Sequence, residues 1–247
     1  MEKEENRKEV SEAYPENIVG DYFFQAQDIP KTFVPLMVSL VENLARQLYR
    51  SYQIIQDPTK LEYAQRIQQE SKLLFTIDKA TNLLEELLSE PDEKTARLSM
   101  AKLEFIYYKT DAQSRLIAKK LEGNDTLKAQ TYFISQPSRP LVKALVSNVE
   151  YYGTTRQKIK AYLLQIYHFA IHNQYKEARE LLLKIHIQEY VHTQELHIQI
   201  LYNRAVTQIG LAAFRLGLIE ETQESLSEIA QNQRIREVLA QGAKQQQ

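Results

Sequence analysis

The sequence has no cysteine, and only 6 glycines and 7 prolines among its 247 residues. Without cysteine there are no disulfides, no thiolate zinc or iron–sulfur sites and no cysteine nucleophile. The absence also fits a reducing compartment, and we expect a cytoplasmic protein. Few turn-forming residues argue against a sandwich or barrel of many short strands. We therefore expect long helices separated by a small number of breaks.

A charge excess of one sign and long apolar runs are missing as well. The 31 Lys and Arg nearly balance the 32 Asp and Glu, giving a net charge of -1. A domain that binds nucleic acid on its own is usually strongly basic, and this chain is not. No apolar run approaches the roughly 18 residues that suggest a membrane-spanning helix. The charged start has no apolar stretch behind it and does not resemble a signal peptide. We expect no membrane partner.

Motifs for catalysis are also absent. A phosphate-binding loop needs clustered glycines. The six glycines of this chain are far apart in the sequence, so neither a P-loop nor a dinucleotide fingerprint is present. There is no G-x-S-x-G elbow and no Asp-Asp pair of the kind that holds magnesium in helical terpene synthases. We expect no enzyme activity, no cofactor and no small-molecule substrate.

The histidines give the weak signals for a metal site. His168 and His172 stand at i and i+4, but Phe169 occupies the position where a zinc protease has its glutamate base. We interpret the pair as partly exposed or turn-capping residues near a helix end. His186, His192 and His197 lie in a polar connection and are expected on the surface. We predict no metal site.

The chain divides into five parts by composition and periodicity. We predict a disordered lead over 1–17, an irregular docking segment over 18–35, an N-terminal helical region over 36–152, a helical-repeat region over 153–242 and a disordered tail over 243–247.

Several local signals mark the helices of the N-terminal region. Leu36, Leu40, Leu44, Leu48 and Tyr52 recur at i+4 and predict one apolar stripe. The next segment, over 61–88, is either one long helix or two with a kink near residue 71. Ser89 is expected to cap a further helix, with Pro91 in its first turn. Breaks at 123–125 and 136–140 leave 109–140 without an assignment.

The last third contains an internal repeat. Two helix pairs follow each other, and their second helices open around Glu177 and Glu221, which are 44 residues apart. This period is typical of two-helix solenoid repeats. The alternative is an ordinary helical bundle in which the 44-residue similarity arose by chance. Thr154 and Gln157 have capping-box spacing. Gly210, inside a helix, predicts a close approach between helices. The fold class is therefore all-α, a stack of antiparallel helix pairs.

Two short basic groups are candidates for contact with RNA or a partner protein. The first is Arg115, Lys119 and Lys120, and the second is Arg156, Lys158 and Lys160. Either group could meet phosphates, although a solvated helix face is the plainer interpretation. Some of the 15 tyrosines could serve interfaces, where tyrosine is enriched.

Longer motifs of the last third resemble the C subunit of eukaryotic translation initiation factor 3. They are residues 165–168, 178–181, 199–204, 210–218 and 236–242. A looser similarity extends back to residue 58. The resemblance implies a right-handed superhelical stack of helix pairs, with TPR/HEAT-like repeats, that leads into a winged helix as a PCI domain. That winged helix should begin soon after Gly242, so we expect the chain to be part of a longer protein.

The resemblance implies a non-catalytic scaffold whose partners are the other subunits of the initiation factor and the small ribosomal subunit, through protein and rRNA. The alternative is the same architecture in another assembly, such as a proteasome-lid or signalosome-like complex. A helical enzyme is the third class, for which we find no motif.

Overall fold

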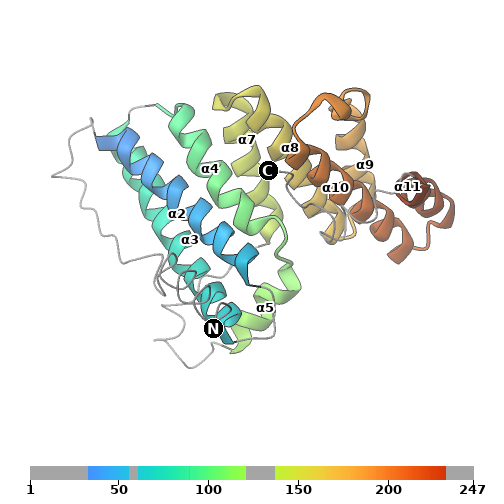
Figure 1. The fold of residues 1–247 in the computed structure, drawn as a ribbon, viewed down its shortest axis with the longest axis horizontal. Helices are drawn as coiled ribbons and strands as arrows, with labels where there is room; N and C mark the ends of the chain where they lie inside the picture. Colours follow the sequence, from blue (N-terminus) through green and yellow to red (C-terminus); the bar gives the residue numbers. More distant parts are fainter. Residues whose placement is uncertain (1–32, 56–60, 89, 121–136, 232–247) are drawn as a thin grey trace, which may run out of the picture. The chain divides into compact units, whose positions relative to one another are not determined.

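Figure 1 shows a computed structural model that describes residues 33–55, 61–88, 90–120 and 137–231. Over these residues the chain forms helices and no strand. In order, they are α2 (Val34–Ile54), α3 (Leu61–Leu87), α4 (Glu93–Ile106), α5 (Asp111–Lys120), α7 (Ser138–Tyr152), α8 (Thr155–Ile171), α9 (Tyr175–Lys184), the 3-10 turns η3 (Ile187–Glu189) and η4 (Val191–Thr193), α10 (Leu196–Arg215) and α11 (Ile219–Gln231). The expected all-α fold is confirmed.

The chain forms two compact units. Unit 1 comprises residues 1–105 and 114–135, and unit 2 comprises residues 106–113 and 136–247. The parts expected over 1–17, most of 18–35 and 243–247 lie outside the described residues, as do Ser89 and the break at 123–125. The domain boundaries predicted from the sequence stay predictions. Within the described ranges, none of the helices is long and apolar enough to cross a membrane.

In unit 1, α2, α3 and α4 pack on one another around a leucine-rich core. The fully buried large side chains of this core are Leu48, Leu73, Leu74, Ile77, Leu84, Leu98 and Leu103. Arg97 on α4 bridges to Glu42 on α2, and Lys102 on α4 pairs with Asp78 on α3. Residues 61–87 form one continuous helix, which settles the choice left open by the sequence.

The apolar stripe predicted for α2 is partly wrong. Leu44 and Leu48 are buried, but Leu36 is 63% exposed and Leu40 is 37% exposed. Residues spaced strictly at i+4 drift around a helix with 3.6 residues per turn, so such a row leaves the core face after two turns. The buried face instead mixes steps of three and four and includes Val34, Met37, Val38, Val41 and Ala45.

The start of α4 also differs from its expected form. Asp92, not Ser89, caps the helix, because its Oδ1 accepts hydrogen bonds from the backbone N–H groups of Lys94 at 2.8 Å and Thr95 at 3.4 Å. The Thr95 hydroxyl accepts in return from the backbone N–H of Asp92. The helix therefore begins at Glu93, after Pro91, and does not include Pro91 in its first turn as expected.

Asp92→Ala is expected to destabilise unit 1 by about 1 kcal/mol, because the first turn of α4 loses the acceptor for its free N–H groups. Urea denaturation at pH 7 measures the change. Asp92→Asn, which keeps the accepting oxygen, should recover most of the loss. If the alanine and asparagine variants are equally destabilised, the cap is not what Asp92 supplies.

Unit 2 contains the predicted repeat. The helices α8 and α10 both end in a Schellman motif, in which the N–H of the second residue beyond the cap bonds a carbonyl five residues earlier. The bonds run from Gln174 to Phe169 at 2.9 Å and from Leu218 to Ala213 at 3.0 Å. Each residue of the second pair lies 44 positions after its counterpart in the first, as does the left-handed Gly217 after the left-handed Asn173. The helices α9 and α11 then begin at equivalent positions, which confirms the helical repeat.

Helix packing within unit 2 follows from this repeat. The helix α8 packs against α7, α9 and α10, and α10 packs against α11 (Figure 1). Arg215, in the last turn of α10, donates hydrogen bonds to the Ala170 carbonyl at 2.8 Å and to Asn173 Oδ1 at 2.6 Å. It thereby ties the C-terminus of α10 to the end of α8. The capping box of Thr154 and Gln157 at the start of α8 is confirmed.

Candidate functional site

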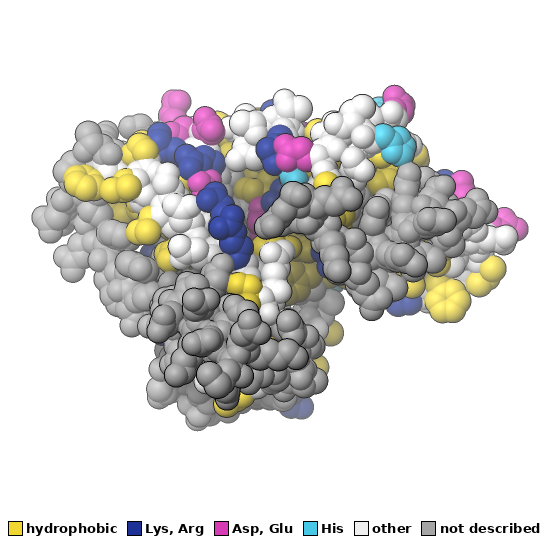
Figure 2. Space-filling view, viewed as in Figure 1, with side chains coloured by type: hydrophobic (Ala, Val, Ile, Leu, Met, Phe, Trp, Pro, Cys, Tyr) yellow, Lys and Arg dark blue, Asp and Glu magenta, His cyan; other side chains and the backbone are white. Residues whose placement is uncertain are grey.

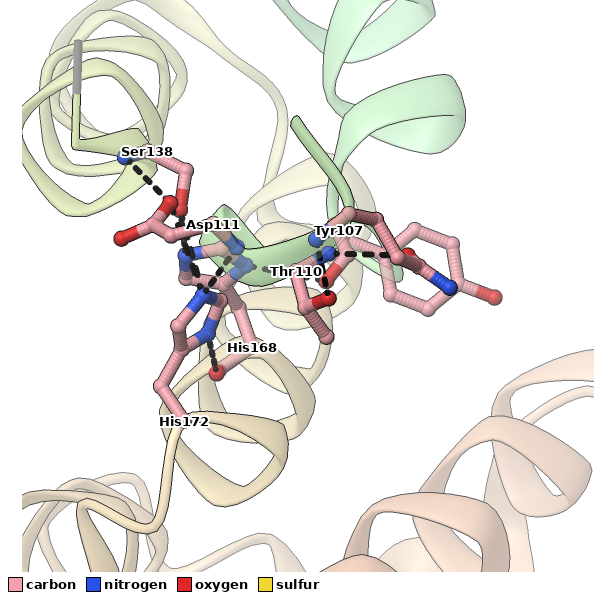
Figure 3. Close-up of polar contacts among 7 residues, drawn as sticks. Tyr107, Thr110, Asp111, Ser138, His168 and His172 are labelled. Atoms are coloured by element: carbon pink, nitrogen blue, oxygen red, sulfur yellow. Dashed lines mark hydrogen bonds and ion pairs between the residues drawn. The ribbon is translucent and has the colours of Figure 1, made fainter. Parts of the chain in front are cut away.

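A polar cluster inside unit 2 joins three segments that are distant in sequence. Figure 3 shows His168 and His172 from α8, Ser138 from the start of α7, and Tyr107 and Asp111 from the segment between α4 and the first turn of α5. All five belong to unit 2. The cluster brings the titratable side chains of His168, His172 and Asp111 together within unit 2.

His168 is fully buried and hydrogen-bonded at both ring nitrogens. Its Nδ1 lies 3.0 Å from the Tyr107 carbonyl and its Nε2 lies 3.0 Å from the Ser138 hydroxyl. Because a carbonyl only accepts, Nδ1 carries the proton and Nε2 accepts from Ser138. Burial lowers the pKa of His168 to about 4, against the opposing effect of the Tyr107 carbonyl. The imidazole is therefore neutral at physiological pH.

His172 is the C-cap residue of α8 and uses its ring in the same way. Its Nδ1 donates to the His168 carbonyl in the last turn of the helix at 2.9 Å. Its Nε2 accepts from the backbone N–H of Asp111 at 3.2 Å. The ring thus fastens the first residue of α5 to the last turn of α8.

Asp111 and Ser138 complete the network. The backbone N–H of Ser138, at the start of α7, donates to Asp111 Oδ1 at 2.9 Å. Burial opposes the charge on Asp111, but the hydrogen bonds from Ser138 and the nearby His172 hold its pKa below the usual value. A carboxylate at a helix N-terminus is also favoured by the helix dipole.

The cluster has the parts of a nucleophile and a base but not their setting. Ser138 and His168 lie at hydrogen-bond distance, yet both are 0% exposed, so a substrate has no access to the hydroxyl. Among the described residues, no group of three or more histidine, cysteine or acidic side chains is placed to hold a metal ion. What the cluster does is hold residues 106–113 against α7 and α8.

The histidine predictions are thus partly right. His168 is fully buried, so its expected partial exposure is wrong, while the turn-capping role is confirmed for His172. His186, His192 and His197 are exposed, as predicted. Ser138, Tyr107 and Asp111 were missed, because they lie between 27 and 61 residues from their partners and no local pattern marks them.

The six basic candidates lie on two helices. On α5, Arg115 and Lys119 are exposed, while the side chain of Lys120 lies outside the described part. On α8, Arg156 is exposed and pairs with Glu195, and Lys158 and Lys160 are half-buried. Contact of either group with RNA or protein stays a prediction.

Arg156 belongs to an exposed edge of unit 2 that the sequence did not reveal. We call this the Tyr151 edge and define it as Tyr151, Arg156, Glu195, Leu196 and His197. Tyr151 is 77% exposed and Leu196 is 55% exposed. The ion pair between Arg156 and Glu195 joins the first turn of α8 to the start of α10, and His197 Nδ1 lies 3.3 Å from the same Glu195 carboxylate. Tyrosine and arginine are enriched in protein-binding surfaces, and the exposed leucine adds apolar area at these helix ends.

Comparison with known proteins identifies related chains. The family model described as the N-terminus of eukaryotic translation initiation factor 3 subunit 8 matches residues 9–247. The C subunit of eukaryotic translation initiation factor 3 from Botryotinia fuckeliana is 37% identical over 221 residues, which cover 83% of this chain and 25% of the relative.

Two further relatives carry the same name. The protein from Neurospora crassa is 34% identical over 219 residues, covering 83% of this chain and 24% of the relative. The protein from Schizosaccharomyces pombe is 33% identical over 210 residues, covering 83% of this chain and 22% of the relative. The chain therefore spans about a quarter of the length of the curated relatives that it matches.

Proposed function

The chain belongs to the family of the N-terminus of eukaryotic translation initiation factor 3 subunit 8, and on that premise we propose that it is a non-catalytic scaffold segment acting in translation initiation. Its partners are other subunits of the initiation factor and the small ribosomal subunit, and it works in the cytoplasm. Family membership favours this assembly over a proteasome-lid or signalosome-like complex, which helical repeats alone would also allow.

Family membership carries the proposal, and the Tyr151 edge on the helical repeat is the surface that we assign to it. Each helical repeat buries its apolar face against the neighbouring repeats. The turns and helix ends stay exposed and can contact partners. Tyr151 and Leu196 expose large apolar area there, and Arg156 pairs with Glu195 on the same edge. We assign this edge to a partner protein within the initiation factor.

The basic groups on α5 and α8 are proposed contacts of a second kind. Arg115, Lys119 and Lys120 stand at i, i+4 and i+5 on α5, and Lys158 and Lys160 follow Arg156 on α8. In a chain of net charge -1 such groups could add local attraction to rRNA or to acidic partner surfaces, and most of the binding would come from the larger assembly.

Affinity purification of the full-length protein from its native cells tests the scaffold role. Initiation factor subunits and small ribosomal subunits are expected to co-purify, and a clean proteasome-lid set would overturn the proposal. Tyr151→Ala with Leu196→Ala is expected to lower the recovery of the other initiation factor subunits about tenfold or more, as interface anchors do.

The matched control changes two exposed apolar side chains elsewhere in unit 2, Leu183 and Ile219, to alanine. This pair removes similar apolar area and should leave the recovered set unchanged. Equal recovery with both double variants would remove the Tyr151 edge from the proposal while leaving the scaffold role standing.

A further inference from the structure

The outer face of the C-terminal half of α2 carries a cationic and aromatic row. Arg46, Tyr49, Arg50 and Gln53 stand at i, i+3, i+4 and i+7, so they share one side of the helix. All four are exposed, and the Tyr49 ring is 54% exposed. The opposite side of α2 is locked in the core of unit 1 by Leu44 and Leu48, so the row stands on a rigid support.

A third arginine extends this row from the neighbouring helix. Arg97 of α4 reaches across to α2, where its Nε donates to Glu42 at 2.8 Å and its guanidinium contacts the Ser39 hydroxyl at 3.5 Å. Glu42 lies one turn before Arg46 and two turns before Arg50, so the three guanidinium groups follow one another along α2. We call Arg97, Arg46 and Arg50 the arginine ladder.

The ladder keeps a positive charge in spite of the near-neutral chain. Arg97 compensates Glu42, and after Glu42 the described part of α2 has no acidic residue. Arg46 donates to the neutral Asn43 at 2.9 Å, and neither Arg46 nor Arg50 forms an ion pair with a described residue. Figure 2 shows Lys and Arg side chains gathered in a row over α2 and α4.

We propose that the arginine ladder and Tyr49 form a binding site for single-stranded RNA. Arg46 and Arg50 are separated by about 6 Å along the helix axis, a repeat that suits successive phosphates of an extended strand. Tyr49 stands between them and offers a ring on which one base stacks, while the guanidinium groups hold the phosphates on either side. Gln53 supplies a neutral hydrogen-bonding group at the end of the row.

The surroundings of the row favour a nucleic acid strand over a protein. A protein interface centres on buried apolar anchors, but the exposed residues beside Tyr49 on this face are Arg46, Arg50 and Gln53, which are all polar. Two guanidinium groups that pair with no carboxylate of the described residues, in line with one exposed ring, are the elements that sequence-tolerant single-strand sites use. The site adds a ligand to the scaffold role and does not depend on it.

Fluorescence anisotropy with the 247-residue chain and an unstructured 12-nucleotide oligouridine tests the site. We expect the chain to bind at low salt. The slope of log K against log salt concentration should become shallower by about 0.7 for each phosphate contact that is removed. Arg46→Gln with Arg50→Gln should weaken binding at least tenfold and lower the slope by about 1.4. Tyr49→Ala should weaken binding about tenfold without changing the slope, and Tyr49→Phe should restore it.

The matched control removes two positive charges from another helix. Lys176 and Lys184 on α9 are exposed and lie among Glu177 and Glu180, so Lys176→Gln with Lys184→Gln should bind like the unaltered chain. Circular dichroism melts check folding, and Arg46→Lys with Arg50→Lys should retain the salt slope. Absence of binding by the unaltered chain, or equal losses with the α9 and α2 variants, would overturn the proposal.

Discussion

A leucine placed at position 210 is expected to lower the free energy of unfolding by about 1–3 kcal/mol or more, because the space that it needs is already filled. A Cβ added to Gly210 would lie 2.6 Å from Leu226 Cδ2, 2.8 Å from Leu226 Cγ and 3.3 Å from the Ser225 Cβ. The helices α10 and α11 approach each other closely here, and a branched side chain must push them apart. Urea denaturation at pH 7 measures the loss.

Three further variants separate overpacking from other effects of this glycine. Gly210→Ala gains roughly 1 kcal/mol of helix propensity but still meets Leu226, so it should do much less harm than leucine. Leu226→Ala in the Gly210→Leu protein should recover part of the loss, which a double-mutant cycle reads directly. Arg204→Leu, an exposed position on the same helix, should stay within about 0.5 kcal/mol of the unaltered chain. Equal stability of the unaltered chain and Gly210→Leu would show that α11 does not press on this position.

The features of unit 2 that the sequence predicted correctly are those encoded by neighbouring residues. Thr154 and Gln157 form their capping box within one turn. The 44-residue repeat was visible because each pair of helices must reuse the same turn geometry. Gly210 was visible because glycine within a helix needs a reason.

Features that depend on tertiary context were missed. The face of α2 that is buried depends on where α3 lies, so a row of leucines alone placed Leu36 and Leu40 in the core wrongly. The buried state of His168 depends on Tyr107 and Ser138, which the fold brings from 61 and 30 residues away. The Tyr151 edge likewise needs the ion pair across 39 residues between Arg156 and Glu195.

The second large effect is a loss of stability in mild acid that comes from His168. Its pKa falls from the ordinary 6.5 to about 4 on folding, because burial disfavours the charged ring. Between these values the unfolded chain binds a proton that the folded chain refuses, so stability rises with pH through this window. The contribution is fully present above pH 6.5 and is lost as the pH falls toward 4. At the lower end the loss of stability amounts to about 3 kcal/mol.

Urea denaturation at intervals between pH 7 and pH 4 should show this dependence, and variants identify its source. His168→Leu should be less stable at pH 7 by on the order of 2–4 kcal/mol, because the Ser138 hydroxyl and the Tyr107 carbonyl are left buried without the ring. The dependence of its unfolding free energy on pH between 6.5 and 4 should also be smaller, by the amount that corresponds to about one bound proton. His192→Leu, at an exposed position, should change neither quantity.

The contribution of Asp111 separates from that of His168 by its place on the pH scale. Its carboxyl has a pKa held below the ordinary value by Ser138 and His172, against burial, so its stabilisation is lost only at lower pH than the His168 window. A slope between pH 6.5 and 4 that survives in His168→Leu would therefore contradict the assignment to His168. A slope that disappears there would show that this one buried ring makes the anchoring of residues 106–113 sensitive to acid.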